Sequence, residues 1–239
     1  GSMINGRPID VDASHATITR FQRGDVLNTG KDAAIAVDWR SNGSLRMNGS
    51  TTLTLLDGER VALTSGQIYY DSQSLFESDA ASIVVETPFG PIQHMGTQFL
   101  TNVDDAGVTI SVREGRVTFG DSANNFVINT GESAYIDPSK SPVVTEISST
   151  DDAWAWVTGI APARDVDGRS TREIIDWVAR ETGHSVEYLD DQAAVFADRD
   201  QLPGIGEVEP LQALTIIPVA TELEFDIDRD AIRIKLKDR

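Results

Sequence analysis

The stretch from Thr109 to Phe119 reads T-I-S-V-R-E-G-R-V-T-F, two runs rich in β-branched residues on either side of a glycine. Valine, isoleucine and threonine favour strands, and the runs Thr109–Val112 and Arg116–Phe119 alternate in polarity as a half-buried strand does. We therefore expect two strands that meet at a turn containing Gly115, because glycine adopts backbone conformations closed to other residues.

Similar runs continue on both sides of this stretch, from Thr17 to about Ile147, with hardly a segment of helical period. Glycine-bearing turns separate them at a spacing of about 8–12 residues, which is typical of sandwiches, barrels and short solenoids. We expect an all-β domain over residues 4–150, either a twisted β-solenoid or sandwich-like, and the sequence does not choose its closure. The other runs are Ala33–Val37, Ser82–Thr87 and Phe126–Asn129.

The composition is that of an ordinary globular protein, with 40% hydrophobic and 24% charged residues among 239. The 38 acidic and 20 basic side chains leave a net charge of -18, which repels phosphate backbones, so we expect no nucleic-acid partner. No cysteine is present and the three histidines are far apart, which argues against thiol chemistry and zinc. Gly1-Ser2-Met3 has the form of a remnant of tag removal, so the lack of an anchor or signal does not fix the location.

The sequence changes character after Thr150, and we expect a second domain over residues 151–239. Ser170 and Glu173 have the spacing of a capping box, in which each residue caps the backbone of the other. This pattern predicts a helix from Thr171, and Gly183 suits the left-handed position that ends it.

A second helix is expected where Leu211, Leu214 and Ile217 recur at helical spacing, with its end at Pro218. A shift of 37 residues superposes this helix and the strand after it on the first helix and its strand, with Ile174 on Leu211. The sequence therefore predicts a small α+β domain with two helix-strand units. Its strands are expected at Val186–Leu189, Leu223–Ile227 and Ala231–Leu236.

Two acidic clusters resemble metal sites in composition only. Asp226, Asp228 and Asp230 alternate as at the start of a calcium-binding loop, but Ala231 stands where that loop needs glycine. We therefore expect a charged hairpin turn there. The second cluster lies near a presumed loop and has no ligand spacing, so no metal, cofactor or catalytic residue is expected. It comprises Asp190, Asp191, Asp198 and Asp200.

Aromatic residues on the β domain leave a second function open. A platform of exposed rings binds sugars, which would make the chain a periplasmic or surface carbohydrate-binding module, whereas the commoner role of such rings is core packing. A hydrolase with paired carboxylates is a third reading, and no residue pattern supports it. The candidate platform residues are Tyr69, Tyr70, Phe76 and Phe89.

Five short motifs follow one another between Leu63 and Glu132. They are Leu63–Asp71 (L-T-S-G-Q-I-Y-Y-D), Ile83–Pro88 (I-V-V-E-T-P), Met95–Phe99 (M-G-T-Q-F), Ile110–Val117 (I-S-V-R-E-G-R-V) and Asn129–Glu132 (N-T-G-E). Their order and spacing resemble the FecR family, transmembrane regulators of sigma factors. We expect the motif residues to shape strands and turns rather than to contact a ligand. These residues are Gly66, Tyr69, Gly96, Thr97, Phe99, Glu114, Gly115, Val117 and Gly131.

The resemblance implies the periplasmic region of a single-pass inner-membrane protein from a Gram-negative bacterium. Such a region is not an enzyme and holds no cofactor. It relays a signal from the N-terminal signalling domain of a TonB-dependent outer-membrane transducer, which imports an iron chelate such as a siderophore complex. The signal reaches an extracytoplasmic-function (ECF) sigma factor through a cytoplasmic segment, so the protein is an anti-sigma factor of cell-surface signalling. A homodimer is left open.

The C-terminal domain resembles the secretin and TonB short N-terminal domain. We expect it to carry much of the recognition through an exposed strand edge or helix face, because small sheets can extend one another by main-chain hydrogen bonds. Ala231–Leu236 is the candidate edge strand, and the alternative is that it is an internal strand. Its alternating apolar and basic residues are Ile232, Arg233, Ile234, Lys235 and Leu236.

Overall fold

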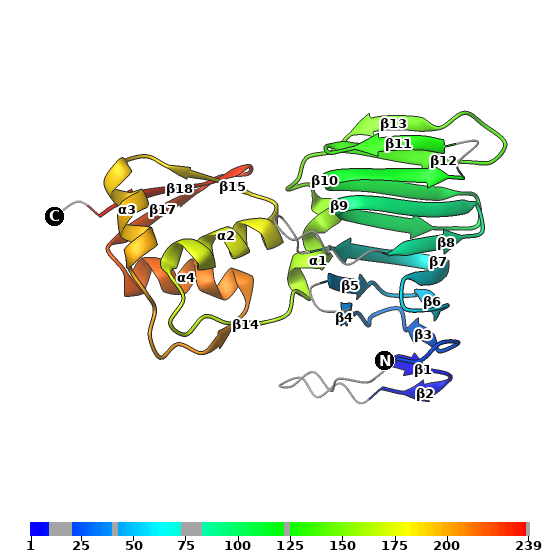
Figure 1. Cartoon of the computed structure of the whole chain (residues 1–239), viewed down its shortest axis with the longest axis horizontal. Helices are drawn as coiled ribbons and strands as arrows, with labels where there is room; N and C mark the ends of the chain where they lie inside the picture. The colour runs from blue at the N-terminus through cyan, green and yellow to red at the C-terminus, as the bar shows by residue number, and fades with distance from the viewer. Residues whose placement is uncertain (10–20, 40–42, 73–82, 122–124, 238–239) are drawn as a thin grey trace. The chain divides into compact units, whose positions relative to one another are not determined.

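The computed structural model describes residues 1–9, 21–39, 43–72, 83–121 and 125–237. The chain divides into two compact units, Gly1–Ile147 and Ser148–Arg239, which we call the β unit and the α+β unit (Figure 1). The β unit consists of strands, and the helices lie in the α+β unit. The predicted fold class is confirmed.

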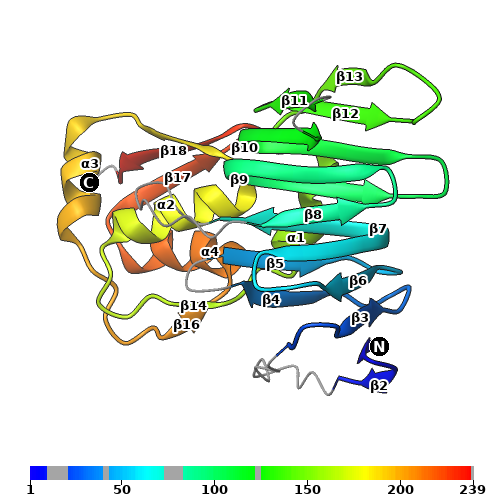
Figure 2. The same ribbon diagram turned by 45° about the vertical axis from the view of Figure 1, so that its right-hand side comes forward.

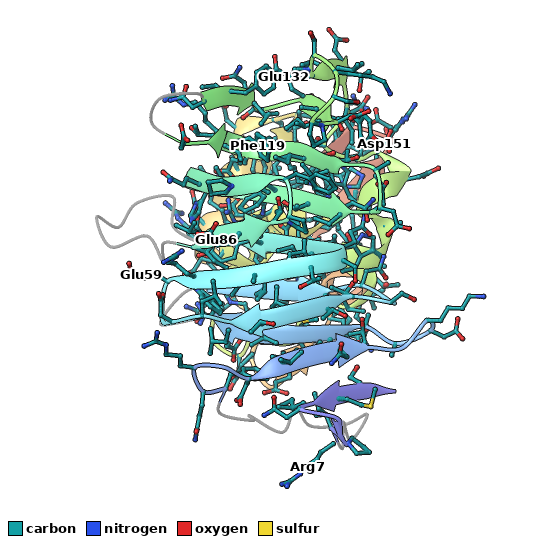
Figure 3. The ribbon with its side chains drawn as sticks, turned by 90° about the vertical axis from the view of Figure 1, so that its right-hand side faces the viewer. Arg7, Glu59, Glu86, Phe119, Glu132 and Asp151 are labelled. Carbon is teal, nitrogen blue, oxygen red and sulfur yellow. The ribbon has the colours of Figure 1, made fainter. Side chains whose placement is uncertain are left out.

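The described part of the β unit forms one connected sheet of 13 strands. Figure 3 shows them side by side, from the strand that carries Arg7 to the strand that carries Glu132. The strands are β1 (Ser2–Ile4), β2 (Arg7–Pro8), β3 (Val26–Thr29), β4 (Ile35–Trp39), β5 (Gly43–Met47), β6 (Thr52–Leu55), β7 (Arg60–Asp71), β8 (Val84–Thr87), β9 (Gly90–Val103), β10 (Val108–Gly120), β11 (Asn125–Asn129), β12 (Glu132–Ile136) and β13 (Val143–Glu146).

Three long strands, β7, β9 and β10, each change neighbours part-way along their length. The first half of β10 pairs with β12 and its second half with β11. The first half of β9 pairs with β8 and its second half with β7. Likewise, β7 begins between β6 and β8 and ends between β5 and β9. Each long strand therefore belongs to two layers of the unit, and apolar residues of both layers form one core.

The expected turn at Gly115 is wrong, because β10 runs without interruption from Val108 to Gly120. Gly115 instead lies at an irregularity of the ladder, where β10 passes from one partner to the next. Its backbone has a φ of +79°, and the glycines at the corresponding changes in β7 and β9 have φ of +89° (Gly66) and +55° (Gly96). The runs that the sequence shows as separate strands are thus the two halves of one bent strand.

The bend in β9 is sharp enough to bring its two halves face to face. The rings of His94 and Phe99 stack with centroids 5.9 Å apart, although five residues of straight strand span about 16 Å. Tyr70 of β7 completes the group, with its ring centroid 4.9 Å from that of His94. Gly96 lies between the stacked residues, so the chain turns at this glycine.

Gly66 is more tightly enclosed than Gly96. An added β-carbon would lie 2.5 Å from both Cα and Oγ1 of Thr51, closer than any non-bonded contact allows. A β-carbon on Gly96 would meet nothing within 4 Å. The two positions therefore share a positive φ but differ in the space around them.

This difference gives a matched pair of variants. We expect Gly66→Ala to destabilise the β unit by about 3 kcal/mol or more, since the steric overlap adds to the strain of a positive φ. Gly96→Ala carries only the strain and should cost about 1 kcal/mol. Thermal unfolding followed by circular dichroism measures both, and equal losses would contradict the steric argument.

The α+β unit contains two small sheets. Its elements are the 3-10 turn η1 (Asp152–Trp154), α1 (Ala155–Gly159), β14 (Arg164–Asp165), α2 (Thr171–Thr182), β15 (Ser185–Tyr188), α3 (Asp191–Arg199), β16 (Glu207–Val208), α4 (Pro210–Ala220), β17 (Leu223–Ile227) and β18 (Ala231–Leu236). In Figures 1 and 2, α2 and α4 lie side by side between the β15–β18–β17 sheet and the short β14–β16 ladder. Among the described residues, no helix has the length and apolar character needed to cross a bilayer.

The first helix begins and ends as predicted. The Glu173 amide donates to the Ser170 hydroxyl at 3.2 Å, and the Ser170 amide donates to the Glu173 carboxylate at 2.9 Å. Gly183 ends α2 with a φ of +81°. Hydrogen bonding to Ser170 lowers the pKa of Glu173, which keeps this cap charged.

Helix α4 departs from prediction in two ways. It continues through Pro218 to Ala220, because a proline near the C-terminal end removes only one backbone donor. Its buried side carries Ala213 and Ile217, whereas Leu211 is 55% exposed. Ile174 is buried in α2, so a shift of 37 residues matches a core residue to a surface one. A shift of 39 residues, which matches Ile174 to Ala213, brings the two helices into phase.

Candidate functional site

The motif residues of the β unit are architectural. The side chains of Tyr69, Thr97, Phe99 and Val117 are fully buried. These four side chains therefore belong to the packed interior of the β unit.

Gly131 and its neighbour connect the motifs to one another. Gly131 has a φ of +80° in the turn between β11 and β12, and its amide donates to the Val112 carbonyl at 2.9 Å. The amide of Thr130 donates to the Gly115 carbonyl at 3.2 Å, beside the half-buried Glu114. These two hydrogen bonds connect the turn to the bend of β10, which lies between the half that pairs with β12 and the half that pairs with β11.

The described aromatic residues do not form an exposed platform. Tyr69 and Tyr70 are fully buried, and the ring of Tyr70 packs on His94 and Phe99. Phe89 is half-buried against the core, and Phe76 lies outside the described residues. The platform hypothesis is therefore wrong for both tyrosines, because consecutive strand residues face opposite sides and here both sides are covered.

The acidic clusters of the α+β unit stabilise turns and helix ends. Asp228 accepts from the amides of Asp230 and Ala231, each at 2.9 Å, and pairs with Arg233. These hydrogen bonds, led by the Asp230 amide, lower the pKa of Asp228 to about 2. The predicted hairpin turn is confirmed, and β17 and β18 are its two strands.

The second acidic cluster is divided among separate structural contacts. Asp190 caps α3 by accepting from the Ala193 amide at 2.6 Å, and Asp200 accepts from the Thr171 hydroxyl at 2.9 Å. Asp198 pairs with Arg172. Among the residues that the structure describes, no three histidines or carboxylates come together as a metal site.

The expectation that Ala231–Leu236 is an exposed sheet edge is wrong, and the alternative, an internal strand, holds. β18 lies between β15, with which it is parallel, and β17, with which it is antiparallel. Ile232 and Ile234 are fully buried, while Arg233 pairs with Glu187 on β15 and Lys235 with Glu224 on β17. The basic residues therefore face carboxylates of both neighbours instead of a partner protein.

The free edges of this sheet are β15 and β17. In the β17–β18 ladder, Lys237 donates to Glu222 at 2.8 Å and Asp228 donates to Ala231 at 3.1 Å. Hydrogen-bonded and non-hydrogen-bonded residue pairs alternate along an antiparallel ladder, so these two bonds place Phe225 and Ile227 at non-hydrogen-bonded positions. The main-chain groups of Phe225 and Ile227 therefore face away from β18. Ile227, near the end of β17, is 43% exposed.

The β15 edge is built differently. The amides of Ser185 and Leu189 donate to carbonyl oxygens in β18 and in the turn just before it. The amides of Val186 and Tyr188 therefore face away from β18. The guanidinium of Arg172 lies 4.5 Å from the centre of the Tyr188 ring and also pairs with Asp198 on α3. This network connects α2, α3 and β15.

Part of the β unit matches a known family model. Residues 25–118 match the family model described as FecR protein. This part of the chain is similar to the FecR family. The match contains the bends at Gly66, Gly96 and Gly115. FecR proteins are regulators, not a family of enzymes.

No curated protein sequence matches the chain. Two crystal structures of a "putative anti-sigma factor" from Parabacteroides distasonis ATCC 8503 resemble it, with identities of 15% and 12% and TM-scores of 0.47 and 0.46. Each comparison covers 89% of this chain and 99% of the other. The α+β unit lies outside the FecR match, so the match says nothing about the surfaces of this unit.

The buried Tyr188 hydroxyl allows a test of the contacts that connect β15 to the helices. This oxygen is buried with no hydrogen-bond partner among the described residues, and burial raises the pKa of Tyr188 to about 12. Since the unfolded side chain ionises near pH 10, the tyrosine contribution to stability is intact below about pH 10 and is lost as pH rises toward 12.

We expect Tyr188→Phe to be as stable as the natural chain at pH 7, or about 1 kcal/mol more stable, because an unpartnered buried hydroxyl is removed. At about pH 11 the advantage of the variant should grow. Urea unfolding followed by the helical circular dichroism signal, which reports on the α+β unit, measures both. A variant that loses stability at pH 7 would show that the hydroxyl is hydrogen-bonded.

Proposed function

We propose that the chain is the periplasmic sensor region of a transmembrane sigma-factor regulator. The FecR match over residues 25–118 carries this proposal. The region would receive the signal of a TonB-dependent outer-membrane transducer engaged in iron uptake. A cytoplasmic segment of the same protein would bind the ECF sigma factor, and the inner membrane would lie between the two.

Recognition of the transducer is assigned to the free edge of β17. An edge strand with unpaired amides binds an extended segment of a partner by main-chain hydrogen bonds. The outward groups of Phe225 and Ile227 supply these bonds, and Asp226 contributes a negative charge to the edge. The partner strand would therefore be apolar and basic, which fits attraction to a chain of net charge -18.

The test compares proline variants on the two edges of one sheet. Ile227→Pro removes an outward amide of β17 and retains the ladder to β18, while Val186→Pro does the same on β15. With the isolated signalling domain of the transducer encoded beside the natural gene, we expect Ile227→Pro to weaken binding by about tenfold or more. Val186→Pro should bind as the natural chain does. Titration calorimetry measures the affinities, and circular dichroism checks that both variants fold.

A loss of binding in Val186→Pro alone would assign recognition to β15. Unchanged binding in both variants would remove the sheet edges from the interface. If the natural chain does not bind any transducer signalling domain of its own organism, the relay itself is contradicted.

The placement in the periplasm has its own test. The full natural gene product should sediment with the inner membrane of a Gram-negative host. Protease added to spheroplasts should digest residues 4–239, which are expected on the periplasmic side, while a cytoplasmic tag survives. A soluble product, or a segment protected until the membrane is broken, would contradict the proposed relay.

A further inference from the structure

A hydrogen bond at the start of β8 defines the protonation state of His94. The amide of Ile83, which directly precedes β8, donates to Nε2 of His94 at 2.9 Å. A ring nitrogen that accepts a hydrogen bond carries no proton of its own. His94 is therefore neutral in this structure, with its proton on Nδ1.

The side chains around the imidazole are apolar or aromatic. Its ring centroid lies 4.9 Å from that of Tyr70 and 5.9 Å from that of Phe99, and Val117 is its partner in the β9–β10 ladder. These three residues and Ile83 are fully buried, while His94 itself is half-buried. Only the phenol of Tyr70 among them can ionise, and it does so near pH 10, far from the acid range. Such surroundings disfavour a charged imidazole.

The charged residues of the neighbouring strands lie on the opposite faces of those strands. All but Glu114 directly adjoin a core residue in their own strand, and successive strand residues face opposite sides. Glu114 lies opposite Gln98 in the ladder, and Gln98 adjoins the core residue Phe99. β9 has no acidic or basic residue apart from His94. The charged residues of the neighbouring strands are Arg46 on β5, Arg60 and Asp71 on β7, Glu86 on β8, and Arg113, Glu114 and Arg116 on β10.

His184 in the α+β unit offers a contrast within the same chain. The Thr182 hydroxyl donates to the Val178 carbonyl at 2.8 Å, so it accepts from Nδ1 of His184, also at 2.8 Å. Among the residues that the structure describes, none donates to Nε2 of His184. The two histidines thus have the same tautomer, but only His94 uses its other nitrogen as an acceptor.

We propose that His94 is an acid-sensitive contact of the β unit, and that a proton bound to its Nε2 releases the Ile83 amide and loosens the start of β8. One lone pair cannot both bind a proton and accept a hydrogen bond, so the two states exclude each other. The change is local at first, because the Val84 amide donates to the Glu59 carbonyl at 2.7 Å and neither group titrates. The proposal does not depend on the transducer or on the sigma factor.

The pH dependence has a defined sign. When the start of β8 is open, the imidazole binds a proton near pH 6.5, as in an unfolded chain. The closed state binds fewer protons in acid, so its stability is intact above about pH 7 and is lost as pH falls below about 6.5. The ratio of open to closed molecules changes by at most about tenfold for each pH unit. From about pH 7 to about pH 5 we expect it to rise about tenfold or more.

The first test measures amide hydrogen exchange of the natural chain by NMR at about pH 7, 6 and 5, with each rate divided by its intrinsic rate. Protection of the Ile83 amide should fall about tenfold or more over this range. The Gly131 amide, which donates to the Val112 carbonyl in the same unit, is the control and should keep its protection. Nitrogen-15 shifts of the imidazoles should show His94 with its proton on Nδ1 at pH 7.

The second test uses a matched pair of histidine variants. A glutamine in place of His94 offers an acceptor oxygen at a similar reach but does not titrate. In His94→Gln, protection of the Ile83 amide should therefore be the same at pH 7 and pH 5. His184→Gln should retain the pH dependence of the natural chain.

Three results would overturn the proposal. The first is protection of the Ile83 amide that does not change with pH in the natural chain, a measurement that needs no variant. The second is an equal pH dependence in His94→Gln, which would assign the effect to carboxylates. The third is a His94 imidazole that carries a proton on Nε2 at pH 7.

Discussion

The β unit depends on one constraint, the need of three long strands to bend where they leave one layer and join the other. A strand of L-amino acids cannot take a positive φ without strain, and the bends in β7, β9 and β10 all have one. Glycine satisfies this requirement, and at Gly66 it also satisfies a second one, because the backbone of Thr51 occupies the space of a β-carbon. The shared core, the stacked rings of His94 and Phe99, and the order of the strands all follow from these bends.

Much of this fold can be predicted from the sequence. The strand runs, the capping box of α2 and the hairpin between β17 and β18 lie where local chemistry predicts them. The continuity of β10 cannot be predicted from local chemistry, because a glycine between two short apolar runs gives the same sequence pattern whether the chain turns back or only bends. Only the pairing of each half with a different neighbour distinguishes the two cases, and those neighbours are distant in sequence.

The errors in the α+β unit have a similar origin. Alternating apolar and basic residues made β18 resemble an exposed edge, yet Arg233 and Lys235 meet carboxylates on β15 and β17, one on each side. The helical spacing of Leu211 and Leu214 suggested a core face, yet α4 has apolar residues on both faces, and such a helix has no unique phase. Helix α3 begins at the aspartate cap of Asp190, which the sequence analysis placed near a loop.

The acidic character of the α+β unit bears on its role. Many of its carboxylates are committed to the fold, as caps, turn acceptors and partners of Arg172 and Arg233. What remains for recognition in the proposed relay is the main-chain edge of β17, which carries the carboxylate of Asp226. An edge of this kind is suited to a basic partner strand, and the attraction between the two should weaken as salt rises because salt screens their opposite charges.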